Sequence, residues 1–141
     1  MPRREEAKRR ILAQWLSRAR SHLGVAEHLV GEGSLFPSAA VFHCQQAVEK
    51  LIKAFLTWNE IDFPKMHDLK QLLDLAASIN QRLADELRQV IALTLYGVEL
   101  RYPGDRPEAS PDEARRALTL ARQVYDTNLP LLPDLSANTG G

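Results

Sequence analysis

The sequence predicts an all-α protein, an antiparallel up-and-down bundle of four main helices plus a shorter extra helix. Two observations point to this fold class. Apolar residues recur three or four positions apart over most of the chain, which is the period of an amphipathic helix. No segment alternates apolar and polar residues at the period of two that a half-buried strand requires.

The first two helices carry the clearest apolar patterns. An apolar stripe that includes Leu16 runs through residues 5–30, and the glycines that follow indicate the end of this helix. The second helix begins after Pro37, with Ser38 as its expected N-cap, and continues to about Trp58. Its apolar side chains cover most of its circumference, so we expect it to be the central and most buried helix.

Two shorter segments follow. Asp68 is the expected N-cap of a third helix, and Asn80 is expected to end it. A fourth amphipathic stretch comes next and is predicted to end near Gly97. The connections between all these segments are short, which suits neighbouring antiparallel helices.

The last helix has the strongest start signal. A proline-bearing connection over residues 102–111 leads into it. Ser110 and Glu113 have the spacing of a capping box, in which each side chain bonds the other residue's amide, and Pro111 lies where no N–H is needed. We expect this helix to extend to about Asn128.

Size and composition suit one folded domain. The chain has 141 residues, of which 45% are hydrophobic and 26% charged, and this composition excludes disorder of the whole chain. We expect a helical domain over residues 1–130 and a flexible C-terminal tail over residues 131–141. Lys and Arg together number 18, as do Asp and Glu, so the net charge is zero and any nucleic-acid site must be local.

Several signals of location and chemistry are missing from the sequence. The single cysteine, Cys44, cannot form an intrachain disulfide, and no stretch approaches the ~18 apolar residues that span a bilayer. We therefore expect a cytoplasmic protein with no membrane association. No Walker loop, GxGxxG turn, HExxH pair or EF-hand loop occurs, and no two histidines are four residues apart. These absences predict no metal and no cofactor.

One face of the second helix is polar although the rest of the helix is apolar. The residues of this polar stripe, three or four positions apart, are His43, Gln46, Lys50 and Lys53, with Gln45 and Glu49 alongside. The two lysines allow two interpretations. They form either a solvated face that pairs with Glu49 and its neighbours, or a patch that faces phosphate or RNA.

Three segments together closely resemble the HEPN family of prokaryotes. They are Gln-Gln-Ala-Val-Glu-Lys-Leu-Ile-Lys-Ala at residues 45–54, Lys-Met-His-Asp-Leu at residues 65–69, and Arg-Tyr-Pro-Gly at residues 101–104. Residues 36–42 are also similar, and the resemblance covers about residues 15–128. It implies a homodimeric helical bundle, often encoded beside a minimal nucleotidyltransferase. In many such pairs the HEPN protein is the toxin and the nucleotidyltransferase the antitoxin.

The resemblance also implies a possible enzymatic activity. Many family members are metal-independent ribonucleases whose signature is an arginine followed by a histidine after four to six residues. No such pair occurs here, since Arg18 and His22 have three residues between them and no histidine follows Arg101. We therefore assign no catalytic residue. The departure favours a dimeric nucleotide- or RNA-binding component of a toxin–antitoxin-like system, and the alternative is a ribonuclease toxin with a degenerate site, using Arg101 and His67.

The candidate ligand contacts come from three parts of the chain: Gln46, Lys50, Lys53, His67, Arg101 and Tyr102. His67 either packs beside the third helix or donates to an anion at that helix start. Arg101 and Tyr102 either hold their own loop together or contact the ligand. The basic residues within positions 3–10 are either solubilising or attract nucleic acid.

Overall fold

The computed structural model describes residues 2–31, 36–63, 69–99 and 109–135, with only the backbone at residues 2, 69 and 93–99. The described residues contain helices and no strands, which confirms the all-α prediction. The elements are α1 (Pro2–Gly31), α2 (Pro37–Trp58), α3 (Leu69–Ala77), α4 (Gln81–Glu99), α5 (Pro111–Asn128) and a 3₁₀ turn (Leu129–Leu131).

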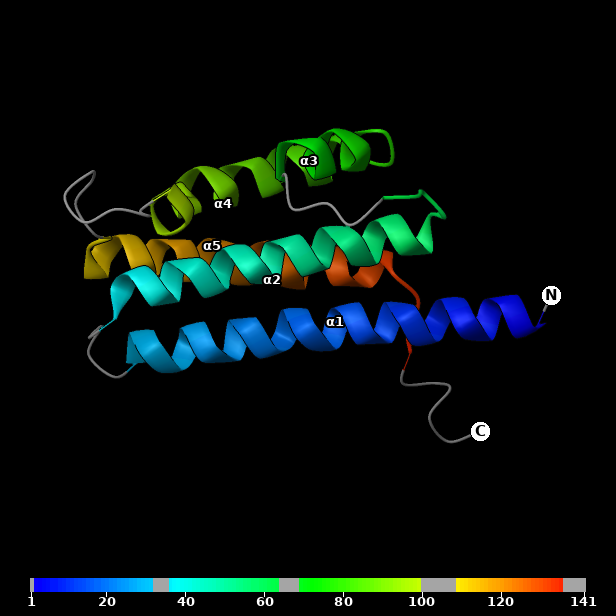
Figure 1. Cartoon of the computed structure of the whole chain (residues 1–141), viewed down its shortest axis with the longest axis horizontal. Coiled ribbons are helices and arrows are strands. Elements are labelled where there is room, and N and C mark those ends of the chain that lie inside the picture. Colours follow the sequence, from blue (N-terminus) through cyan, green and yellow to red (C-terminus); the bar gives the residue numbers. More distant parts are fainter. Residues whose placement is uncertain (1, 32–35, 64–68, 100–108, 136–141) are drawn as a thin grey trace.

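Helix α2 is the centre of the bundle. It packs against each of the other α-helices, and its most extensive contact is with α1. Helices α3 and α4 lie on one side of the layer formed by α2 and α5, and α1 lies on the other side (Figure 1). Between Ala40 and Leu56, the side chains of α2 that are not buried are Phe42, His43, Gln46 and Lys50. The prediction of a central helix is therefore confirmed, and of the four predicted stripe residues His43, Gln46 and Lys50 are partly accessible whereas Lys53 is buried.

The capping box of α5 is present, but Ser38 does not cap α2. Ser110 Oγ accepts from the Glu113 amide at 3.1 Å, and Glu113 Oε1 accepts from the Ser110 amide at 2.9 Å. At α2 the N-cap is Phe36, without a side-chain hydrogen bond, and Pro37 occupies the first turn. Ser38 Oγ instead accepts from the Ala109 amide at 3.0 Å. Ser38 thus ties α2 to the segment that enters α5.

Asn80 begins a helix and does not end one. Helix α3 ends at Ala77, and Asn80 Oδ1 accepts from the Leu83 amide at 3.2 Å in the first turn of α4. Helix α4 continues to Glu99, past the end predicted near Gly97. The predicted cap Asp68 lies outside the described residues.

The packed part of the chain continues beyond α5. Leu132 is 6% exposed and belongs to the hydrophobic core, and Leu135 packs against that core. The core therefore includes part of the segment that was expected to be a flexible tail, while residues 136–141 lie outside the described residues. Within the described ranges, no helix has the length and apolar character needed to cross a membrane.

Candidate functional site

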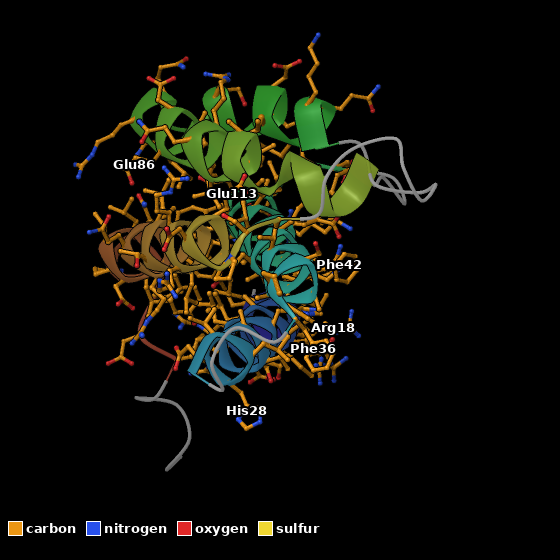
Figure 2. The ribbon with its side chains drawn as sticks, turned by 90° about the vertical axis from the view of Figure 1, so that its left-hand side faces the viewer. Arg18, His28, Phe36, Phe42, Glu86 and Glu113 are labelled. Atoms are coloured by element: carbon orange, nitrogen blue, oxygen red, sulfur yellow. The ribbon has the colours of Figure 1, made fainter. Side chains whose placement is uncertain are left out.

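The polar stripe of α2 lies against α1, and together they form a surface that we call the α1–α2 seam. Its residues are Trp15, Arg18 and His22 from α1, and His43, Gln46, Glu49, Lys50 and Lys53 from α2. The two helices run antiparallel and side by side (Figure 1). Arg18 and Phe42 project from the same side of the bundle, away from α5 (Figure 2). The seam is thus a lateral surface of the bundle.

Both predicted lysines contact one carboxylate. Glu49 Oε2 lies 2.8 Å from Lys50 Nζ and 3.6 Å from Lys53 Nζ. Glu49 is only 4% exposed and Lys53 only 5%, whereas Lys50 is partly accessible. The interpretation of Lys53 as part of a solvated face is therefore wrong, although its predicted pairing with Glu49 is present. Two ammonium groups share one carboxylate, so this part of the seam keeps a positive charge.

Three cationic groups of the seam lie close to the Trp15 ring. Lys53 Nζ lies 5.3 Å from the ring centroid, Lys50 Nζ 5.9 Å, and Arg18 Cζ 5.4 Å. The negative face of an indole ring attracts cations at such distances. Trp15 is only half-buried, and its ring centroid lies 6.1 Å from that of Phe63. The seam therefore combines an aromatic surface with more positive than negative charge, a combination suited to phosphates and bases.

The fold also brings together two histidines that are distant in the sequence. His22 Nδ1 and His43 Nδ1 are 3.0 Å apart across the seam, and their ring centroids are 5.2 Å apart. Phe42 meets the His43 ring edge-on at 5.4 Å. Burial lowers the pKa of both histidines, and the positive charges of His43 and Lys50 lower the pKa of His22 further, against the opposing effect of Glu49. His22 was not among the predicted ligand contacts.

The predicted contacts are only partly brought together. Gln46, Lys50 and Lys53 lie on the same stripe of α2, whereas His67, Arg101 and Tyr102 lie outside the described residues.

Part of the basic N-terminal segment has structural contacts. Arg4 forms an ion pair with Glu60, and Lys8 Nζ lies 3.7 Å from the same carboxylate. Lys8 Nζ also lies 4.1 Å from the centroid of the Trp58 ring. These two cations therefore join the start of α1 to the end of α2.

Other reactive groups are poorly placed for chemistry. Among the residues that the structure describes, no group of three or more His, Cys, Asp or Glu side chains is arranged to hold a metal ion. Cys44 is completely buried, and burial raises the pKa of its thiol to about 12. The thiol is therefore a small apolar group in the core, as predicted.

Comparison with known proteins identifies one family. The family model described as HEPN domain matches residues 12–130. This span contains all eight residues of the seam and all six predicted ligand contacts. Comparison with curated proteins and with solved structures finds no significant match.

Proposed function

Because the chain belongs to the HEPN domain family, we propose that it is a dimeric nucleotide- or RNA-binding protein that pairs with a minimal nucleotidyltransferase in a toxin–antitoxin-like system. The α1–α2 seam contacts the phosphates of the ligand. The observation that carries this proposal is the group of cations around Trp15, which exceeds the single carboxylate of Glu49. An excess of positive charge beside a low-dielectric wall attracts anions.

The charged residues of the seam contribute little net stability to the fold. A buried ion pair such as that of Lys53 and Glu49 contributes little net stability, because desolvation offsets much of the attraction. Gln45 adds a further cost, since its Oε1 is buried without a hydrogen-bond partner in the described structure. Apolar residues on this stripe would pack at least as well. The presence of charged residues at this position therefore supports a binding role.

Binding is preferred over ribonuclease activity on the evidence of the sequence. No arginine precedes a histidine with four to six residues between them. A surface that binds phosphate and bases needs only positioned cations and a stacking surface, and Arg18, Lys50 and Trp15 provide both.

Removal of accessible seam charges is expected to weaken RNA binding. Arg18→Gln and Lys50→Gln should each lower the affinity for a fluorescein-labelled decauridylate by about tenfold, the loss of one charged contact. Each should also make the slope of log K against log salt shallower by about 0.7. Fluorescence anisotropy at several salt concentrations measures both quantities. Lys53 is left intact because it is buried.

Controls separate the seam from general electrostatics and binding from cleavage. Arg82→Gln removes an exposed cation on α4 that pairs with Glu86, and Glu86 projects from the opposite side of the bundle to Arg18 (Figure 2). This variant should bind like the parent protein. Competition with unlabelled ATP distinguishes a nucleotide site from an RNA site. Equal losses in all three variants, or no binding of either ligand by the parent, contradict the proposal, and cleavage of the RNA in EDTA supports the ribonuclease alternative instead.

The dimer is a separate prediction. Phe36 and Phe42 are 61% and 41% exposed and offer apolar contact area on the side of the bundle where Arg18 lies (Figure 2). Sedimentation equilibrium at tens of micromolar protein should give roughly twice the 15.9 kDa chain mass. A single species with the mass of one chain would overturn this part of the proposal.

A further inference from the structure

The two facing histidines suggest that proton binding is coupled to ligand binding. We infer that the α1–α2 seam takes up one proton together with its anionic ligand, and that the His22–His43 pair holds this proton. The inference rests on the proposed function, because it concerns the anion that binds at the same seam. It adds the two histidines to the binding residues.

The geometry of the pair fits a shared proton. The ring centroids are 5.2 Å apart and the two Nδ1 atoms 3.0 Å apart. The difference is about twice the distance from an imidazole centroid to its own Nδ1 atom. The two Nδ1 atoms therefore lie between the rings and point toward each other. A hydrogen bond of 3.0 Å between them requires one Nδ1–H donor and one Nδ1 lone pair. To chelate a metal ion, the lone pairs of both Nδ1 atoms would have to point at the ion. Here each lone pair points at the other ring, so this arrangement is poorly suited to chelating a metal.

The same geometry limits the pair to a single added proton. In the neutral pair one imidazole donates from Nδ1 and the other accepts. Protonation of the donating ring at its free Nε2 yields an imidazolium that still donates from Nδ1 to the neutral ring, and this charge-assisted bond is stronger. A second proton would place two Nδ1–H groups against each other. His22 and His43 therefore titrate as a unit, between a charge of zero and a charge of one.

The neighbours of the pair set its charge without ligand. On α2 Lys50 disfavours protonation and Glu49 favours it, and on α1 Arg18 lies one turn before His22. The described residues of α3, α4 and α5 contribute no charge that shifts the pKa of either histidine. Because burial lowers both pKa values from 6.5, the pair without ligand is neutral at pH 7.

A bound anion reverses this balance. A phosphate beside Lys50 adds negative charge close to the pair and favours its protonated form, so the pKa of the pair rises on binding. Protons and anion then bind cooperatively, and each raises the affinity for the other. Affinity should increase as the pH falls through the pKa range of the pair, by at most about tenfold per pH unit for one proton.

The experiment measures decauridylate affinity between about pH 5.5 and 8, where neither uracil nor a phosphodiester titrates. Calorimetry in buffers of different ionisation enthalpy gives the number of protons taken up, which we expect to lie between zero and one and to be largest at pH values between the pKa of the free pair and the higher pKa of the ligand-bound pair. His43→Gln keeps a polar side chain of similar reach but cannot titrate. It should lose the increase at low pH, so that its affinity for decauridylate at about pH 5.5 stays close to its own affinity at about pH 8.

His28→Gln is the matched control. His28 is exposed on α1 and projects from a different side of the bundle from Arg18 (Figure 2), so this variant should keep the pH dependence of the parent. Binding that does not depend on pH, or a pH dependence that persists in His43→Gln, overturns this inference and leaves the proposed function standing. Failure of the parent to bind decauridylate at any pH overturns both.

Discussion

Phe55→Ala is expected to lower the free energy of unfolding by about 3–5 kcal/mol. Phe55 lies in the central helix α2 and is only 3% exposed. Truncation removes the apolar ring from the core and leaves a cavity. Since α2 packs against helices on several sides, the surrounding side chains have little freedom to fill that cavity.

Urea denaturation monitored by circular dichroism tests this expectation, with the slope of free energy against urea checked for constancy between variants. Ile11→Ala is the control, because Ile11 is an apolar residue of α1 that is 45% exposed. It should change the free energy of unfolding by less than about 1 kcal/mol. A loss of less than about 1 kcal/mol for Phe55→Ala would mean that α2 is not the central helix.

The sequence was sufficient to predict the bundle because its apolar residues repeat with the helical period. The start of α5 was equally clear, since Ser110 and Glu113 form a capping box within a single turn. Local signals failed where a side chain has a distant partner. Ser38 has the chemistry of an N-cap, but it bonds Ala109, which is 71 residues away. Asn80 lies between two helices, and its residue type does not say which of the two it caps.

The candidate site was predicted less completely for a related reason. The spacing of Lys50 and Lys53 placed both on one stripe, but charged residues are rarely buried, so the periodicity gave no sign that Lys53 would be covered. Its burial depends on how α1 packs over α2, with Trp15 beside the lysines. That packing is a property of the folded hairpin.

A usable signal for the histidine pair was present but needs the register of that hairpin. His22 and His43 are 21 residues apart in the sequence, and His22 lies nine residues before the end of α1 whereas His43 lies six residues after the start of α2, an offset of three residues. Trp15 and Lys50 have the same relationship. In an antiparallel helical pair, residues at equal distances from the connection lie opposite each other. Applied to the two predicted helices, this rule places His22 opposite Gln46, three residues from His43, so it brings the histidines to within one turn of each other but does not by itself pair them.

Glu49→Gln is expected to lower the free energy of unfolding by about 3–5 kcal/mol. The substitution preserves the shape of the side chain but removes the only carboxylate within ion-pair distance of Lys53 among the described residues. Lys53 is 5% exposed and would lose its counter-ion in a poorly solvated position. The loss of the Glu49 carboxylate has a smaller effect on Lys50, because the Lys50 side chain is partly accessible to water.

The double variant Glu49→Gln/Lys53→Met tests whether the loss comes from the unpaired charge. Met follows the path of the lysine stem without its ammonium group, so the double variant should recover most of the stability measured by urea denaturation. If Glu49→Gln unfolds at the same urea concentration as the parent, Lys53 is not buried in solution. A double variant that regains stability but binds decauridylate more weakly than the parent would indicate that the charges of this stripe serve ligand binding, since the fold is stable without them.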